Sequence, residues 1–200
     1  MKYKAMLFDG DGVTLQSSML FSEQLNQEFG ISMAVVQPFF TGAFLDCSIG
    51  KAELKQELAK VVGDWGWKGT VDELLDFWFT KGTEVNQEAL TYIQSLPREG
   101  VRLFLASDQE TYRAERVWKL LGRDGLFERL FYSAEMGVRK TSPAFFESVY
   151  QELLIKSPDL QKSEVLLIDD GEKNVVAAKA FGFDAHFYTT LEELKTFLLV

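Results

Sequence analysis

The apolar residues of this chain follow two patterns, which divide it into unequal parts. Short apolar runs bounded by Gly, Ser or Asp predict buried strands, and segments with apolar residues three and four apart predict helices. The strand-like runs are 4–8, 101–106, 129–132, 165–168 and 185–188. The helical segments after the first run are 19–29, 51–62, 70–79, 84–96, 111–121, 142–154 and 174–181, with a last helix after Thr190.

Strands and helices alternate only in the second part of the chain. Between about residues 16 and 82 the pattern is helical, with an irregular stretch at 31–50 that contains Pro38 and Gly42. Alternation with short connections implies right-handed crossovers and a parallel sheet with helices on both faces. The sequence therefore predicts an α/β, Rossmann-like core domain from residues 1–15 and 83–200. Residues 16–82 are expected to form a small helical cap domain inserted after the first strand.

Charge and cysteine content narrow the possible partners. The 200 residues carry 30 Asp and Glu against 21 Lys and Arg, a net charge of −9, which disfavours binding to nucleic acid or to anionic membranes. No run approaches the roughly 20 apolar residues of a membrane span. The one cysteine, Cys47, excludes internal disulfides and fits a reducing compartment. We expect a cytoplasmic protein, a monomer or homodimer, with Cys47 as a small apolar residue.

Polar side chains follow several of the predicted strands. Asp9 and Asp11 come after the first strand, Ser107 after the second and Asp169 with Asp170 after a later one. In parallel sheets ligands bind outside the carboxyl ends of the strands, where these side chains would meet. Carboxylates held that close repel one another unless a cation or a proton lies between them.

Each of these features also has an ordinary structural explanation. Asp9-Gly10-Asp11-Gly12 alone could be a solvated turn, because Asp and Gly are common turn residues. The pair Asp169-Asp170 alone could cap a helix. Their joint occurrence at strand ends, with Lys140 a few residues beyond another strand, favours a catalytic site that binds a cation.

Four segments together resemble the haloacid dehalogenase-like (HAD) hydrolase superfamily. The family opens with a strand followed by Asp-x-Asp-Gly, matched by 8–14 (FDGDGVT). Its second signature is a strand ending in Ser or Thr, matched by 103–107 (LFLAS), and its third a lysine after a Gly-containing turn, matched by 137–140 (GVRK). The fourth is an acidic pair after a strand, matched by 167–171 (LIDDG). The helical insert resembles the C1 cap of the subgroup with phosphoglycolate phosphatase, beta-phosphoglucomutase and sugar phosphatases.

The resemblance implies roles for the matching residues. Asp9 would be the nucleophile that attacks a phosphoryl group, and Asp11 the acid that protonates the leaving oxygen and then activates water. Ser107 and Lys140 would bind the phosphoryl oxygens, with Arg139 as the alternative to Lys140.

The same resemblance implies a magnesium site. Asp9, the backbone carbonyl of Asp11, Asp169 and Asp170 would hold Mg²⁺, with Asp170 as the expected direct ligand. The expected function is thus a Mg²⁺-dependent phosphatase that hydrolyses a small phosphomonoester, such as a sugar phosphate, through an aspartyl-phosphate.

Three other functions stay open from the sequence. A 2-haloacid dehalogenase is disfavoured by Asp11, since a halide leaves without a proton. A phosphomutase would need basic cap residues, for which Lys51, Lys55 and Lys68 are candidates. A catalytically idle binding protein is the third.

Two groups of residues carry further expectations. The cap aromatics are expected to fill the cap core, with Trp65 and Trp67, on a Gly-flanked loop, as the exceptions available to stack on a substrate. Asp108 is expected to cap the helix that follows it.

Overall fold

A five-stranded parallel sheet forms the centre of the computed structural model, which describes residues 2–17, 19–81, 83–96 and 100–199. The strand order is β5-β4-β1-β6-β7, so the first strand lies in the middle, with Leu7 beside Phe104 on one side and Leu167 on the other. The strands are β1 (Ala5–Phe8), β4 (Arg102–Ser107), β5 (Leu130–Tyr132), β6 (Val165–Asp169) and β7 (Asp184–Phe187). The sequence prediction of a parallel α/β core is confirmed.

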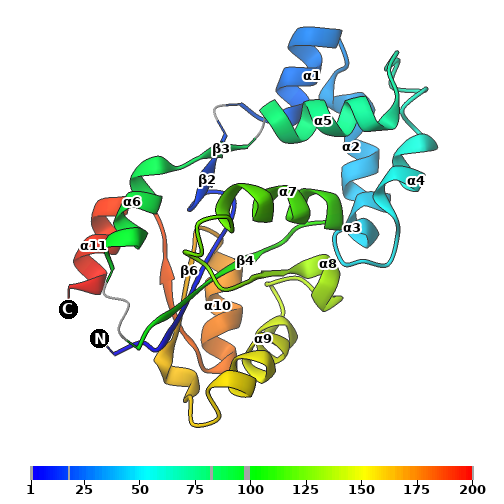
Figure 1. The fold of residues 1–200 in the computed structure, drawn as a ribbon. Helices are drawn as coiled ribbons and strands as arrows, with labels where there is room; N and C mark the ends of the chain where they lie inside the picture. The colour runs from blue at the N-terminus through cyan, green and yellow to red at the C-terminus, as the bar shows by residue number, and fades with distance from the viewer. Residues whose placement is uncertain (1, 18, 82, 97–99, 200) are drawn as a thin grey trace.

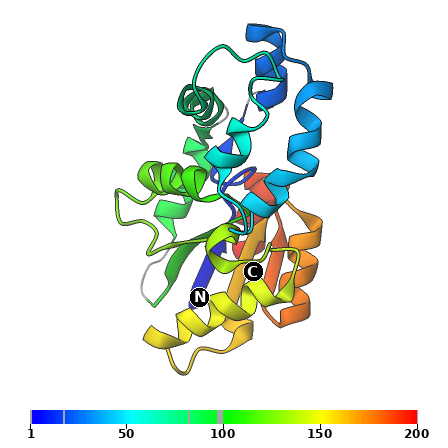
Figure 2. The same cartoon turned by 90° about the vertical axis from the view of Figure 1, so that its right-hand side faces the viewer.

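Helices cover both faces of this sheet (Figures 1 and 2). Alternate side chains of β1 enter two separate apolar clusters because successive residues of a strand point to opposite faces. Met6 and Phe8 pack on one face with the helices before and after β4 and the helix after β7, whereas Leu7 packs on the other face with helices that follow β5 and β6. The core helices are α6 (Gln87–Ser95), α7 (Thr111–Leu121), α8 (Ser133–Met136), α9 (Pro143–Lys156), α10 (Glu172–Phe181) and α11 (Leu191–Leu198), with a 3₁₀ turn at Lys162–Glu164.

A separate group of helices lies above the carboxyl-end edge of the sheet (Figure 1). They are α1 (Phe21–Phe29), α2 (Met33–Thr41), α3 (Ala43–Cys47), α4 (Leu54–Ala59) and α5 (Val71–Lys81). Leu25, Leu58, Leu74 and Trp78 belong to a third apolar cluster that these helices share. Their separate core supports the proposed division into a cap of residues 16–82 and a core of 1–15 and 83–200, although position 82 lies outside the described residues.

The chain enters and leaves the helical group through a short ribbon. Strand β2 (Leu15–Gln16) pairs antiparallel with β3 (Glu84–Val85), with Leu15 opposite Val85. Two-residue strands have no visible period, so the sequence pattern predicted a helix from Glu84. That helix begins instead at Gln87, where the Asn86 side chain accepts the N–H of Ala89 at 3.2 Å.

The stretch at 31–50, predicted to be irregular, contains two helices. Helix α2 continues through Pro38, whose fixed φ is compatible with a helix although its missing N–H removes one hydrogen bond. The helix ends at Gly42, where an added Cβ would lie 2.8 Å from the Pro38 carbonyl oxygen. Helix α4 starts later than the predicted 51–62 because Glu53 caps its first turn, and it also ends earlier, at Ala59. Within the described residues, no helix has the length and apolar character needed to cross a bilayer.

Candidate active site

The loop after β1 places Asp9 at the carboxyl edge of the central strand. The Thr14 hydroxyl donates to the Asp9 carbonyl oxygen at 2.8 Å and closes this loop. Gly12 has a φ of +81°, and a Cβ there would lie 1.9 Å from an Asp170 carboxylate oxygen. Glycine at this position therefore gives the loop both its conformation and its close approach to Asp170.

The buried Lys140 side chain contacts carboxylates at the ends of two neighbouring strands. Its Nζ lies 2.6 Å from Asp9 Oδ1 and 2.6 Å from Asp169 Oδ2, and it donates to the Ala106 carbonyl oxygen at 3.0 Å. The Lys140 side chain is 1% exposed. All three ammonium protons are thus directed at protein oxygens from β1, β4 and β6, and the lysine neutralises carboxylates that the sheet brings together.

The pKa values of these groups follow from burial and mutual charge. Burial raises the pKa of Asp9 well above its ordinary value, and the nearby Lys140 only partly offsets this. Burial alone would lower the pKa of Lys140, but Asp9 and Asp169 together raise it above the ordinary lysine value. Burial, with Asp169 beside it, also raises the pKa of Asp170. Lys140 is therefore charged, and its single positive charge does not fully compensate the carboxylates around it.

The two acidic residues after β6 have different surroundings. Asp169 is fully buried, and its Oδ1 accepts the Gly171 N–H at 2.8 Å and the Asn174 side-chain amide at 2.9 Å. Asp170 is exposed. Each of Asp9, Asp169 and Asp170 offers a ligand atom, and these atoms lie within 4.8 Å of one another.

This carboxylate set fits a hard divalent cation. The three carboxylates outnumber the Lys140 ammonium, which lies against two of them. Oxygen-only ligand sets of this kind are those that Mg²⁺ accepts. The donor atoms at this edge of the sheet are therefore suited to the magnesium ion expected from the sequence.

Ser107 ends β4 beside the first loop. It is 1% exposed, and its Oγ would lie 2.8 Å from a Cβ added at Gly10. Its hydroxyl accepts a hydrogen bond from the Gln109 side-chain amide at 3.1 Å. The structure thus brings Ser107 next to the loop that carries Asp9 and Asp11, as the sequence predicted.

Asp11 is held by two donors that sequence reasoning missed. Arg113 Nη2 lies 2.6 Å from Asp11 Oδ1, and Gln109 Nε2 lies 2.6 Å from Asp11 Oδ2. The signal available in the sequence is their position: Gln109 lies in the loop directly after the strand that ends in Ser107, and Arg113 lies four residues later in the first turn of α7.

Asp108 does not cap the following helix, contrary to expectation. Glu110 is the N-cap of α7 and accepts the N–H groups of Tyr112 and Arg113. Asp108 instead accepts the backbone N–H of Lys140 at 2.9 Å and the Arg139 Nε–H at 3.2 Å. It therefore ties the loop of Lys140 to the end of β4, and it pairs with Arg139.

A cleft of about 410 Å³ opens between the helical group and Asp11. Its polar wall includes Asp11 and Arg113, and its apolar wall includes Phe21, Phe44 and Trp78. The prediction that Trp65 and Trp67 are the available aromatics is wrong. Both pack among cap aromatics, Trp65 against Phe39 at a centroid distance of 5.6 Å and Trp67 against Phe29 at 4.7 Å.

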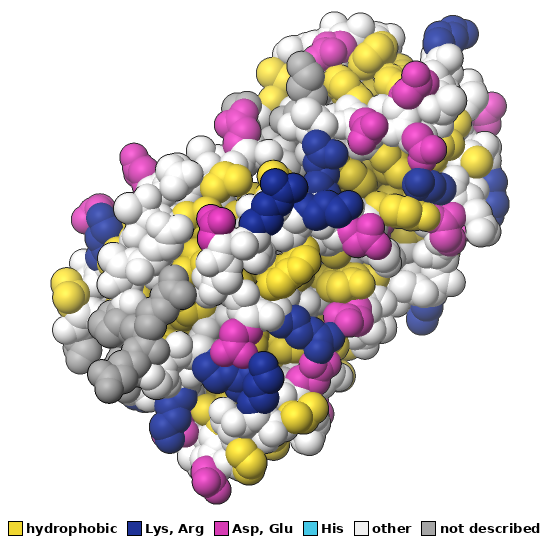
Figure 3. Space-filling model, in the orientation of Figure 1, with side chains coloured by type: hydrophobic (Ala, Val, Ile, Leu, Met, Phe, Trp, Pro, Cys, Tyr) yellow, Lys and Arg dark blue, Asp and Glu magenta, His cyan; other side chains and the backbone are white. Residues whose placement is uncertain are grey.

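The helical group also contacts the core through charged side chains. Figure 3 shows Lys and Arg side chains gathered across the middle of the visible face, at the level of α7. Arg116 of α7 donates to the Thr80 hydroxyl of α5 at 2.7 Å, whereas Lys55 pairs within the helical group, with Asp72 at 2.7 Å. Lys55, a candidate for sugar-phosphate contact, is thus held by a carboxylate outside the cleft.

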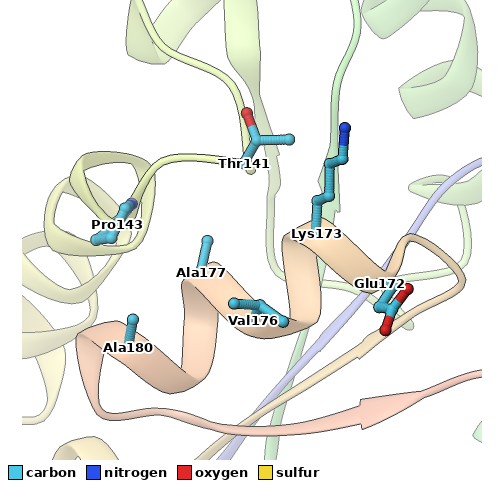
Figure 4. Close-up of a pocket in the computed structure, with 7 residues that line it drawn as sticks. All are labelled: Thr141, Pro143, Glu172, Lys173, Val176, Ala177 and Ala180. Carbon is cyan, nitrogen blue, oxygen red and sulfur yellow. The ribbon is translucent and has the colours of Figure 1, made fainter.

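A second hollow, of about 430 Å³, lies on the outer side of α10 and the start of α9 (Figure 4). Its lining residues are Thr141, Pro143, Glu172, Lys173, Val176, Ala177 and Ala180. Lys173 points toward the level of Thr141, whereas Glu172 points away from it (Figure 4). This hollow contains none of the predicted site residues, so the cleft beside Asp11 is the candidate active site.

Comparison with known families agrees with this geometry. The family model of the haloacid dehalogenase-like hydrolases matches residues 3–182, which include all four strand-end segments. The chain belongs to this family. It is therefore a HAD-like hydrolase.

The relatives of this HAD-like hydrolase include a curated enzyme and solved structures. D-ribitol-5-phosphate phosphatase of Bacteroides thetaiotaomicron is 27% identical over 151 residues, which are 72% of this chain and 70% of the relative. A HAD family enzyme from the same organism, crystallised with magnesium and inorganic phosphate, superposes with a TM-score of 0.78 at 19% identity, over 96% of this chain and 98% of the other.

A more distant structural relative belongs to the dehalogenase branch. L-2-haloacid dehalogenase from Xanthobacter autotrophicus, with chloropropionic acid covalently bound, gives a TM-score of 0.66 at 16% identity, over 98% of this chain and 82% of the other. At these identities, the solved structures establish the fold of this HAD-like hydrolase.

Proposed function

We propose that this HAD-like hydrolase is a Mg²⁺-dependent phosphatase that acts on a small phosphomonoester through an aspartyl-phosphate on Asp9. The observation that carries the proposal is the convergence of Asp9, Asp11, Ser107 and Lys140 at one edge of the sheet, beside the Asp169-Asp170 pair. The phosphatase named among the relatives supports it.

In the first step the Asp9 carboxylate attacks phosphorus, and the bond from phosphorus to the ester oxygen breaks. Asp11 donates its proton to that oxygen, which leaves as an alcohol. Asp11 lies on the wall of the cleft, where the leaving group would sit. Ser107 stabilises the charge spread over the phosphoryl oxygens, and Lys140 adds to this as the Asp9 carboxylate gives up its charge to the new bond.

In the second step water attacks phosphorus, and the bond from phosphorus to the Asp9 oxygen breaks. Asp11, now a carboxylate, takes the proton of that water, and inorganic phosphate leaves. Lys140 faces Asp9 while Asp9 is free. Esterification removes the Asp9 charge, so one Lys140 N–H then turns to the phosphoryl oxygens.

Asp9, the Asp11 carbonyl and Asp170 would hold Mg²⁺, which reduces the repulsion between the anionic nucleophile and the anionic phosphate. Asp170 is the proposed direct ligand of the acidic pair because it is exposed, whereas both oxygens of Asp169 already accept hydrogen bonds from Lys140, Gly171 and Asn174.

The size of the cleft supports a small leaving group. A volume of about 410 Å³ is at the lower end of the range for small-molecule sites. A sugar or polyol phosphate fits this volume, with its carbon chain against Phe44 and Trp78 and its hydroxyl groups toward the polar wall. The first substrates to test are therefore phosphates of five- and six-carbon sugars and polyols, including ribitol 5-phosphate.

Hydrolysis of p-nitrophenyl phosphate tests the proposal. We expect activity with Mg²⁺, loss of activity in EDTA with recovery on adding Mg²⁺, and loss of at least about 1,000-fold in Asp9→Asn, since the variant lacks the nucleophile. A matched control is Asp64→Asn, an exposed carboxylate in a cap loop.

Two results would contradict the phosphatase assignment. Release of halide from a 2-haloacid without Mg²⁺ would place this chain in the dehalogenase branch. Equal aryl phosphate activity in Asp9→Asn and the parent protein would show that Asp9 is not the nucleophile.

A further inference from the structure

The Asp11 carboxylate is far more exposed than the two side chains that hold it. Its side chain is 53% exposed, whereas that of its partner Arg113 is 12% exposed, and Gln109 is 5% exposed. An exposed Asp side chain rotates freely unless its oxygens are held. Two donors of fixed position would therefore decide where this carboxyl group points.

Both donors are fixed by their own surroundings. The Glu110 side chain accepts the backbone N–H of Arg113 at 2.5 Å, which anchors the first turn of α7. The Gln109 carbonyl oxygen accepts the N–H of Ala134 at 3.2 Å and the Ser133 hydroxyl at 3.3 Å. The two side chains thus approach Asp11 from a rigid part of the core.

The guanidinium of Arg113 has little else to bind. Its Nε is buried without a hydrogen-bond partner within the part of the chain that the structure describes, and Asp11 is the carboxylate with which it pairs. Because the Asp11 side chain is 53% exposed, solvent screens this ion pair and limits its contribution to stability. The pair lies instead on the wall of the cleft, together with Gln109 and Trp78.

We propose that Arg113 and Gln109 are positioning residues that aim Asp11 at the leaving oxygen. This inference rests on the proposed phosphatase function. Arg113 holds Oδ1 and Gln109 holds Oδ2, so the carboxyl plane is fixed relative to the cleft while the second lone pair of each oxygen remains available. Without these two donors the Asp11 side chain is no longer fixed, and its carboxyl group adopts rotamers that do not face the leaving oxygen.

The proposal predicts a dependence on the leaving group. An alkoxide must be protonated as it departs, whereas 2,4-dinitrophenolate departs without a proton. For both esters kcat/KM reports the steps up to release of the alcohol or phenol. Mispositioning of Asp11 should therefore lower kcat/KM for an alkyl phosphate and leave kcat/KM for the dinitrophenyl ester nearly unchanged.

The experiment compares ribitol 5-phosphate, or whichever alkyl phosphate the parent protein hydrolyses best, with 2,4-dinitrophenyl phosphate. For Arg113→Met and Gln109→Leu we expect kcat/KM on the alkyl ester to fall about 100-fold, the lower end for loss of general acid catalysis. On the dinitrophenyl ester kcat/KM should fall less than about 5-fold, because that ester requires no general acid. Its kcat should fall, since hydrolysis of the aspartyl-phosphate still needs Asp11.

The matched control is Arg116→Met, on the same helix. Arg116 pairs with Asp76 at 3.7 Å, outside the cleft, and its loss should not change the ratio of the two kcat/KM values. Equal losses on both esters in Arg113→Met and Gln109→Leu, or no loss on either, would overturn the positioning role. Should Arg113→Met not fold, Gln109→Leu decides by the same ratio. A parent protein inactive on both esters would instead refute the phosphatase function, and the positioning role with it.

Discussion

The buried position of Lys140 leads to a prediction about stability. Replacing Lys140 by Met keeps a side chain close in length to the aliphatic part of lysine and removes the ammonium group. The carboxylates of Asp9 and Asp169, each 2.6 Å from Nζ, would then share a buried site without a counter-charge. We expect Lys140→Met to fold less stably in the absence of divalent metal.

The magnitude follows from the burial of all three groups. Removing one partner of a buried ion pair typically costs about 3–5 kcal/mol, because the remaining charge is left uncompensated. For a chain of this length, 1 kcal/mol corresponds to about 2–4 °C in Tm. Lys140→Met should therefore lower Tm by about 6–20 °C.

Arg139→Met provides the matched control. Arg139 is 46% exposed and pairs with Asp108 at 3.2 Å, so its loss should cost no more than about 1 kcal/mol. The assay is thermal and urea unfolding in EDTA, repeated with Mg²⁺. Mg²⁺ should restore part of the stability of Lys140→Met, since an ion that binds only the folded state stabilises it.

Two outcomes would refute this reasoning. If Lys140→Met and Arg139→Met unfold at the same temperature in EDTA, Lys140 does not compensate buried charge. If Mg²⁺ stabilises the parent protein and leaves Lys140→Met unchanged, the carboxylates do not share one cation site.

Two further predictions concern Gly12 and Cys47. Gly12→Ala should weaken Mg²⁺ binding, measured by calorimetry, because its Cβ would lie 1.9 Å from an Asp170 oxygen, whereas Gly30→Ala, at a similar φ of +71° but in open space, should leave binding unchanged. Cys47 is 2% exposed, so an aromatic disulfide reagent should modify it only when denaturant opens the cap. Burial, with Glu57 nearby, raises the pKa of Cys47 to about 11. The unfolded chain therefore releases this proton at lower pH than the folded chain, and the Cys47 contribution to stability, measured by urea unfolding, should decline from about pH 9 to 11.

The sequence could predict those site residues whose position is set by the order of strands in the sheet. Parallel strands end at one edge of the sheet, so polar residues directly after apolar runs must meet there. Asp9 directly follows β1, and Ser107 and Asp169 are the last residues of β4 and β6, the two neighbours of β1 in the sheet. The positions of the strands in the sequence were enough to predict that these three residues meet.

The residues that were missed depend on side-chain direction. Helical spacing shows that the cap aromatics share a face, but only the docking of cap on core decides that Phe44 and Trp78, rather than Trp65, face the cleft. The hydrogen bonds of Gln109 and Arg113 to Asp11 likewise join residues about 100 positions apart. The position of these two residues just after the Ser107 strand is visible in the sequence, but it does not show that their side chains reach Asp11.

The ribbon of β2 and β3 has a consequence for how this protein could be rebuilt. Because Gln16 and Glu84 are paired neighbours, the chain departs from the sheet and returns to it at one place. A tight turn between them would bridge the same gap as the entire insert. The α/β core could thus be produced without its helical lid, or grafted with a lid from another source, while the strand ends keep their arrangement.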